Sequence, residues 1–362
     1  MTASDISNDK TRASVYLRIL ASVVFILTIS TAFLNWRIDP LQYYRKAAYP
    51  PEFSESSRYQ NPGLARNYPY DALVIGSSVS LGFDTNHLRE KLGWNALNLA
   101  MSGGTAHEQR LLLDVAMRTG RARHVLRDLN FEFSRGRPDW VTDYDGAFPG
   151  YFYDEQPLTK ISNYLLNIDV TKKSIRVLLR RCGLHLSRQY SELADLTRPD
   201  PARKAGRQAV VEKWKRAEIN GWPAAKFPGE FSSENLRASF DENVFEPIRS
   251  HPEIQFDLYF PPFSFAYYAI MQRFAPEAFQ EMFRWKQYVL DKTHPLRNVR
   301  VHDFQGVPEI VLDLDRYVDP VHYTREVHDV IIDGVASGRY LATKTRLVDT
   351  EAMLRTEAKK KP

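Results

Sequence analysis

An uncharged apolar run near the N-terminus places the strongest constraint on how this chain can fold. From Ile19 to Trp36 the sequence reads ILASVVFILTISTAFLNW, which is 18 residues without a charge. As a helix this run spans about 27 Å, close to the ~30 Å hydrocarbon core of a bilayer. Tyr43 and Tyr44 follow it, where the headgroup zone favours aromatic side chains. The run predicts one transmembrane anchor over residues 19–36, with residues 1–18 on the cytoplasmic side.

A cleaved signal peptide is the alternative to an anchor. Ser30-Thr31-Ala32 has the small-x-small pattern that signal peptidase accepts, but the apolar run continues through Phe33 and Leu34, which favours the anchor. Lys and Arg flank both ends of the run, so the charges alone do not fix its orientation. A single N-terminal apolar segment before a large domain usually acts as an uncleaved export signal. We expect a single-pass protein of the cytoplasmic (inner) membrane with its domain on the periplasmic or extracytoplasmic side.

The composition excludes several classes of protein. With 362 residues, 43% of them hydrophobic, the chain can bury a sizeable core, and its one cysteine excludes a disulfide framework and a Cys-rich metal site. No His, Asp or Glu cluster has the spacing of metal ligands, so we expect neither a catalytic metal nor a cofactor. The net charge of +5 permits an anionic partner without requiring one. Nucleic-acid binding is not expected of an exported domain.

Beyond a linker or arm at 37–69, short apolar runs alternate with helical patterns. Strands are predicted at 71–75, 95–100, 124–133, 254–260 and 299–304, and helices at 86–92, from Thr105 onward, at 275–291 and at 324–337. Thr105 and Glu108 form a capping-box pattern at the start of one helix. This alternation predicts an α/β domain over 70–347, with a parallel sheet covered by helices on both faces. The residues after it, 348–362, are predicted to be a charged tail that frays in solvent or is disordered.

A basic helical insertion interrupts this pattern at about 137–250. Between Thr171 and Arg216 there are 13 Lys and Arg against 4 Asp and Glu. The insertion can face anionic lipid headgroups, helped by the anchor, or it can hold an acidic polysaccharide. A solvated helical subdomain without a ligand is at least as well supported as either.

Four short motifs lie at predicted strand ends, where open α/β sheets bind their ligands. Gly76-Ser77-Ser78 follows the first strand, and Ser78 on this tight turn can present its Oγ and its N–H to a substrate. Asp319-Pro320-Val321-His322 precedes a helix, so Asp319 can bond the Nδ1 of His322 while His322 acts as a base toward a serine. Taken alone, each motif also fits a plain turn, a helix cap or a surface residue.

The other two motifs add candidate donors to an oxyanion hole. The backbone N–H of Gly103, after the second strand, and the side-chain amide of Asn130, after the third, can both point at a developing negative charge. Separately, Gly103 is a turn glycine and Asn130 can satisfy loop backbone. Together with Ser78, His322 and Asp319 they predict an acyl-transfer site.

These four blocks resemble those of the SGNH (GDSL-like) hydrolase superfamily, which carry Ser, Gly, Asn and His in this order. The resemblance covers about 68–136 and 252–340 and implies a three-layer α/β/α, flavodoxin-like fold with a parallel sheet. It implies Ser78 as nucleophile, His322 and Asp319 as its partners, and Ser78, Gly103 and Asn130 in the oxyanion hole. The chain departs from the family pattern twice, because Ser77 replaces the usual Asp of the first block and Asp128 replaces the Gly of the third.

The Gly-Ser-Ser block, the N-terminal anchor and the Asp-Pro-Val-His-Tyr-Thr ending look closest to one branch of that family. This is the envelope-facing branch related to alginate O-acetylation and teichoic-acid D-alanylation proteins. The resemblance implies a serine O-acetyltransferase or acetylesterase that acts on an envelope or extracellular polysaccharide, with an acyl donor and a possible membrane-bound acyltransferase partner. A lipid-directed esterase or thioesterase, and a non-catalytic scaffold of a polysaccharide biosynthesis or export complex, are the alternatives.

Overall fold

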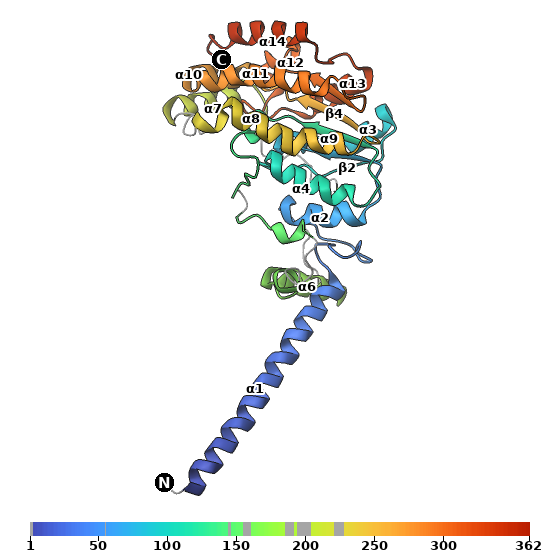
Figure 1. The fold of residues 1–362 in the computed structure, drawn as a ribbon, viewed down its shortest axis with the longest axis vertical. Helices are drawn as coiled ribbons and strands as arrows, with labels where there is room; N and C mark the ends of the chain where they lie inside the picture. The colour runs from blue at the N-terminus through green and yellow to red at the C-terminus, as the bar shows by residue number, and fades with distance from the viewer. Residues whose placement is uncertain are drawn as a thin grey trace.

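A single long helix carries an α/β domain at its C-terminal end (Figure 1). The computed structural model describes all residues except 1–2, 55, 144–145, 155–160, 185–191, 194–203 and 221–227. The long helix is α1 (Ala3–Ile38). Among the described helices, it alone contains a segment, Arg12–Ile38, that is long and apolar enough to cross a membrane. By length and composition this segment is either a membrane anchor or a signal sequence.

Five parallel strands form one sheet in the order β2-β1-β3-β4-β5. They are β1 (Ala72–Ile75), β2 (Ala96–Asn98), β3 (His124–Asp128), β4 (Gln255–Phe260) and β5 (Val299–Asp303). Ala72 lies opposite both Ala96 and His124, so the chain steps outward from β1 to β2 and then returns past β1 to β3. Every residue of β1 is buried, as expected for an apolar strand covered on both sides.

The helices of the domain pack in two groups. In one, α3 (Thr85–Leu92) contacts α13 (Arg325–Ser337). In the other, neighbours contact one another in the order α2 (Ser57–Asn67), α4 (Ala106–Met117), α8 (Ser233–Phe240) and α11 (Pro276–Thr293). Outside the basic insertion, the described residues form four more α-helices of the domain, which are α9 (Glu246–Ser250), α10 (Phe265–Phe274), α12 (Pro308–Val311) and α14 (Lys344–Glu357).

The apolar runs in the sequence predicted all five strands, although three of the strands end earlier than expected. β2 ends at Asn98, β3 at Asp128 and β5 at Asp303. The capping box of α4 is present, with the Thr105 side chain accepting from the N–H of Glu108 and the Glu108 carboxylate from the N–H of Thr105. The prediction of an α/β domain with a parallel sheet is confirmed.

Two segments outside the predicted pattern are folded parts of the domain. The predicted arm at 37–69 contains α2, whose Arg58, Gln60 and Asn61 are buried against the domain. The predicted charged tail is helix α14, which packs on α10 and α11 and buries Leu354 completely. The side of α2 that faces the core is rich in polar residues, and α14 buries only Leu347, Thr350 and Leu354, so hydropathy did not reveal either contact.

From Ile161 onward the described part of the basic insertion is mainly helical, whereas residues 137–143 and 146–149 form no helix. It contains η4 (Ile161–Leu165), α6 (Ile168–Arg181), α7 (Arg207–Asn220) and η7 (Pro228–Phe231). α6 contacts α1, whereas α7 contacts α10 and η9 (Leu314–Arg316). The rest of the predicted helical stretch, between α6 and α7 and after α7, lies largely outside the described residues. The insertion thus reaches two separate places, the end of α1 and the loop before His322.

Candidate active site

Ser78 lies on a tight turn directly after β1. Gly76 ends the strand, and a Cβ at that position would collide with the Ser80 hydroxyl and the Asp128 carboxylate, so only glycine fits. Ser78 then begins the one-turn helix η1 (Ser78–Ser80) and is partly exposed, whereas Ser77 and Ser80 on either side are buried. The turn therefore presents one of three serines to solvent.

His322 and Asp319 lie beside Ser78, although they come from the C-terminal part of the domain sequence. The Ser78 Oγ lies 2.8 Å from His322 Nε2, across 244 positions of sequence. His322 Nδ1 lies 2.9 Å from one oxygen of Asp319 and 3.0 Å from the other. Because both carboxylate oxygens accept, Nδ1 carries the proton of a neutral His322 and Nε2 accepts from the Ser78 hydroxyl. The structure thus brings together the three residues that the sequence singled out as nucleophile, base and orienting acid.

The Asp319 carboxylate is fixed by backbone and by a lysine. Its Oδ1 accepts from the N–H groups of Val321 and His322 at 2.9 and 2.7 Å, which closes the turn around Pro320. Lys213 of α7 donates to Oδ2 at 2.9 Å. Burial raises the pKa of the Asp319 carboxyl, but the hydrogen bonds from His322 and Lys213 outweigh that effect and hold the pKa well below its usual range. Asp319 is therefore ionised throughout the neutral range.

A buried carboxylate holds the turn before Ser78. Asp128 Oδ2, at the end of β3, accepts from the backbone N–H of Ser77 at 2.7 Å and from the hydroxyls of Ser77 and Ser80 at 2.8 and 2.9 Å. The Ser80 hydroxyl also meets the Tyr259 hydroxyl at 2.8 Å. Burial raises the pKa of Asp128 despite these donors. Ser77 and Ser80 are thus committed to this network, which leaves Ser78 as the accessible hydroxyl.

The three predicted oxyanion donors differ in how they are placed. The backbone N–H groups of Ser78 and Gly103 have no acceptor among the described residues, and Gly103 has a left-handed φ of +63° that glycine readily adopts. Asn130 is buried and donates through Nδ2 to the Ser77 hydroxyl at 2.9 Å. An amide nitrogen carries two hydrogens, so one remains beyond this bond.

Two polar side chains that the sequence analysis did not single out tie the loops of the site together. Asn98 donates to the backbone carbonyls of Ser80 and Leu81 at 3.0 and 3.1 Å, which joins the end of β2 to the turn carrying Ser78. His328 of α13 reaches the carbonyl of Val79 at 3.0 Å through Nε2. Burial lowers the pKa of His328 to about 4, so it is neutral near pH 7. His328 lies six residues after His322 in the sequence, and no motif marked it as part of the site.

Other candidates lie away from the site or inside the core. Tyr267 and Tyr268 of α10 are fully buried in the aromatic core. His302 bonds Asp257, and Asp303 pairs with the buried ammonium of Lys286 at 2.9 Å. These groups stabilise the sheet edge at β5 and do not contact Ser78 or His322 in any recorded hydrogen bond.

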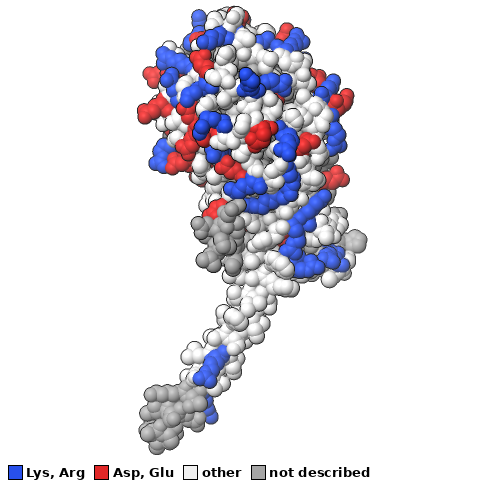
Figure 2. Space-filling view, turned by 45° about the vertical axis from the view of Figure 1, so that its right-hand side comes forward, with Lys and Arg blue, Asp and Glu red and all other residues white. Residues whose placement is uncertain are grey.

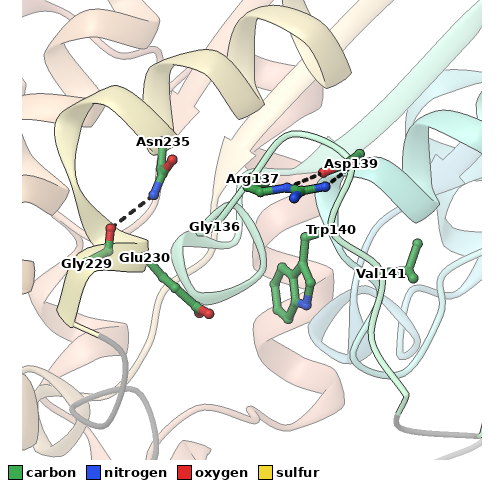
Figure 3. Close-up of a pocket in the computed structure, with 8 residues that line it drawn as sticks. All are labelled: Gly136, Arg137, Asp139, Trp140, Val141, Gly229, Glu230 and Asn235. Atoms are coloured by element: carbon green, nitrogen blue, oxygen red, sulfur yellow. Dashed lines mark hydrogen bonds and ion pairs between the residues drawn. The ribbon is translucent and has the colours of Figure 1, made fainter.

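A cavity of about 540 Å³ opens next to the loop that carries Gly103 (Figure 3). Its wall is joined to that loop because Thr105 Oγ1 donates to the carbonyl of Trp140 at 2.7 Å. The Arg135 guanidinium lies 4.6 Å above the Trp140 ring. The cavity is lined by Gly136, Arg137, Asp139, Trp140, Val141, Gly229, Glu230 and Asn235. Aromatic, acidic, basic and amide groups therefore meet at one opening.

The chain shows no significant similarity to any family model, curated protein or solved structure.

Lys213 places a positive charge beside Asp319, and this charge would affect catalysis by the Asp319–His322 pair. Its ammonium and His322 Nδ1 bond the same oxygen of Asp319, so Lys213 opposes a positive charge on His322. We expect Lys213→Met to move the acid limb of the pH–activity profile to higher pH, because the imidazolium form is no longer repelled. The Lys213 side chain is 48% exposed, so solvent screens it and kcat/KM near neutral pH should change by no more than about fivefold.

The measurement is a pH–kcat/KM profile of the full chain with an activated acetyl ester. Lys213→Arg is the matched control, because it keeps the charge and should leave the acid limb in place. An unshifted acid limb in Lys213→Met would contradict this role.

Proposed function

We propose that the protein is a membrane-anchored serine acyl-transfer enzyme, an O-acetyltransferase or acetylesterase of an envelope polysaccharide. The observation that carries the proposal is the hydrogen-bonded chain Ser78–His322–Asp319 at the carboxyl edge of a parallel sheet. A partly exposed serine hydroxyl beside a histidine that is itself oriented by a buried carboxylate is the arrangement of an activated nucleophile.

In this proposal Ser78 Oγ attacks the acyl carbonyl carbon, and His322 Nε2 takes the hydroxyl proton. The ionised Asp319 stabilises the imidazolium that forms, and the N–H groups of Ser78 and Gly103 with the second amide hydrogen of Asn130 receive the oxyanion. The C–O bond to the leaving group breaks as His322 returns the proton to it, which leaves an acyl ester on Ser78. A sugar hydroxyl or water, deprotonated by His322, then takes the acyl group and restores the serine.

The strand order and the two departures from the family pattern support a relationship to SGNH hydrolases. The order 2-1-3-4-5 is that of flavodoxin-like three-layer folds, whose ligands bind where the strand order reverses, and here Ser78 follows β1 at that reversal. The usual Asp of the first block is Ser77 and the usual Gly of the third is Asp128. In space the Asp128 carboxylate bonds the N–H and hydroxyl of Ser77. The two changes are therefore complementary, because the carboxylate that is missing at position 77 is present at position 128 and bonds Ser77.

The anchor and the cavity support the choice of an envelope polymer as substrate. α1 is apolar enough to hold the domain at a membrane. The cavity next to the Gly103 loop offers an indole at Trp140 and polar groups at Glu230 and Asn235, which suit the apolar faces and hydroxyls of a sugar.

A covalent probe tests the nucleophile directly. The full chain in detergent is treated with a fluorophosphonate, and the adduct is mapped by peptide mass spectrometry. We expect the adduct on Ser78, complete loss of labelling in Ser78→Ala, and unchanged labelling in Ser337→Ala, which removes an exposed serine of α13. Acetyl release from an O-acetylated polysaccharide, compared with long-chain acyl esters, then tests the substrate class.

Two outcomes would contradict the proposal. Folded protein that forms no adduct on Ser78 would favour the scaffold alternative. Labelling of Ser78 together with a clear preference for long-chain esters would support Ser78 as the nucleophile but contradict the polysaccharide substrate in favour of a lipid.

A further inference from the structure

Helix α6 (Ile168–Arg181) is attached to the end of α1 where the apolar segment finishes. Asn35 of α1 is buried and donates through Nδ2 to the Thr171 hydroxyl and to the carbonyl of Leu165, both at 2.8 Å. α1 also contacts α6 and η4 directly, and Figure 1 shows α6 beside the end of α1 nearest the domain. If α1 spans a bilayer, these contacts fix α6 at the level where the chain leaves the hydrocarbon.

One face of α6 is an exposed apolar stripe. Ile168, Ile175 and Leu179 recur at intervals of seven and four residues, so they lie on the same side of the helix with Leu178 beside them. Their exposed fractions are 69%, 45% and 40%, and that of Leu178 is 37%. The opposite side of α6, with Val170, Ser174 and Val177, is the side buried against the protein. The stripe is therefore separate from the face that holds α6 in the fold.

Basic side chains lie mainly on one side of the stripe, between it and the buried face of α6. α6 carries one acidic residue, Asp169, against five basic ones, which are Lys172, Lys173, Arg176, Arg180 and Arg181. Arg176 and Arg180 pair with Glu52, which holds that side of α6 to the domain. At the same level the Arg45 guanidinium lies 4.5 Å over the ring of Trp36, which is 43% exposed. Figure 2 shows Lys and Arg side chains gathered where α1 meets the domain.

We propose that α6 lies on the surface of an anionic membrane. The stripe Ile168, Ile175, Leu178 and Leu179 enters the boundary between headgroups and acyl chains, while Lys172 and Lys173 reach lipid phosphates. A helix with one apolar face and one basic face, fixed at the end of a membrane span, has the features of an interfacial helix. This inference depends on α1 being an anchor and is independent of the proposed catalysis. The second contact fixes the tilt of the domain, which a single anchor leaves free.

The single cysteine of the chain is a built-in reporter. Cys182 is free and exposed, and it directly follows α6 on the side of the stripe. We attach an environment-sensitive fluorophore to Cys182 of the full chain, reconstituted in vesicles of phosphatidylcholine with phosphatidylglycerol or of phosphatidylcholine alone. In the anionic vesicles we expect a blue-shifted emission, quenching by brominated lipid acyl chains and protection from aqueous iodide. The control carries Cys182→Ser with Ser337→Cys, and the emission of its label should indicate an aqueous environment in both kinds of vesicle.

A variant separates the surface contact from the anchor. Ile175→Asp with Leu179→Asp places two charges in the exposed stripe without touching the buried face, so reconstitution and the labelling of Ser78 should be unchanged. We expect this variant to lose quenching by brominated lipid. Lys172→Glu with Lys173→Glu should weaken docking in anionic vesicles by about fivefold or more per residue. A Cys182 label that iodide quenches equally in anionic vesicles and in detergent would overturn the proposal.

Discussion

Asp319→Asn is expected to lower kcat for ester cleavage about 10⁴-fold, with little change in KM. The Asn oxygen can keep the two backbone N–H bonds of Val321 and His322 that close the turn, so the local structure should remain. The Asn amide group then faces His322 Nδ1, and it can only donate there. This donor stands where the nearer carboxylate oxygen accepted from Nδ1, so it favours the form of His322 with its proton on Nε2, the nitrogen that lies 2.8 Å from the Ser78 hydroxyl and is needed as a base.

The measurement is steady-state hydrolysis of an activated acetyl ester by the full chain, and the double variant with Ser78→Ala gives a second test. Residues that act as one catalytic unit are strongly non-additive, so the double variant should be no slower than Ser78→Ala alone. Asp333→Asn is a matched control, because Asp333 also bonds a histidine, His87, at 3.1 Å but on the surface. A loss of less than about tenfold in Asp319→Asn would argue that Asp319 only shapes the turn.

The parts of the site that lie next to strands were predictable from the sequence. A buried strand is a short apolar run, and the residue after its carboxyl end must lie at the edge of the sheet. Gly76, Gly103 and Asn130 could therefore be placed before the structure was known. The pairing of Asp319 with His322 was also local, since three residues around a proline form one turn. What the sequence could not give was the approach of this turn to Ser78, which depends on the packing of the whole domain.

The supporting groups were missed because nothing in the sequence indicates which residues they contact. Lys213 is one of many basic residues in the insertion, and the sequence around it does not indicate that it bonds Asp319. In the sequence Asp128 is only a departure from the family pattern, and its bond to Ser77 in the structure explains why an acid stands there. Arg58 lay in a presumed arm, and its burial follows from tertiary contacts that hydropathy does not report. The role of a buried polar residue depends on the groups that it bonds, and these groups are distant in the sequence.

Arg58 is the strongest case of such a hidden contact. Its guanidinium is almost fully buried, 2.7 Å from the Glu108 carboxylate, which is itself completely buried. It also donates to the carbonyl of Ser102 at 2.9 Å, next to Gly103. The same carboxylate accepts the N–H groups of Thr105 and Thr142 at 3.2 and 3.0 Å. One ion pair thus joins α2, the start of α4, the Gly103 loop and the segment after Trp140.

Arg58→Met is expected to lower the free energy of unfolding by about 3–5 kcal/mol, because it leaves the Glu108 charge buried without its cation. Urea unfolding of the full chain in detergent, followed by tryptophan fluorescence, measures the change. Adding Glu108→Gln should recover part of the loss, since a neutral amide needs no counter-charge, so the two changes should be less than additive. Arg249→Met, at an exposed pair with Glu246, makes the same chemical change and should leave the midpoint nearly unchanged. Equal midpoints for Arg58→Met and Arg249→Met would show that the buried pair does not hold α2 and the Gly103 loop to the domain.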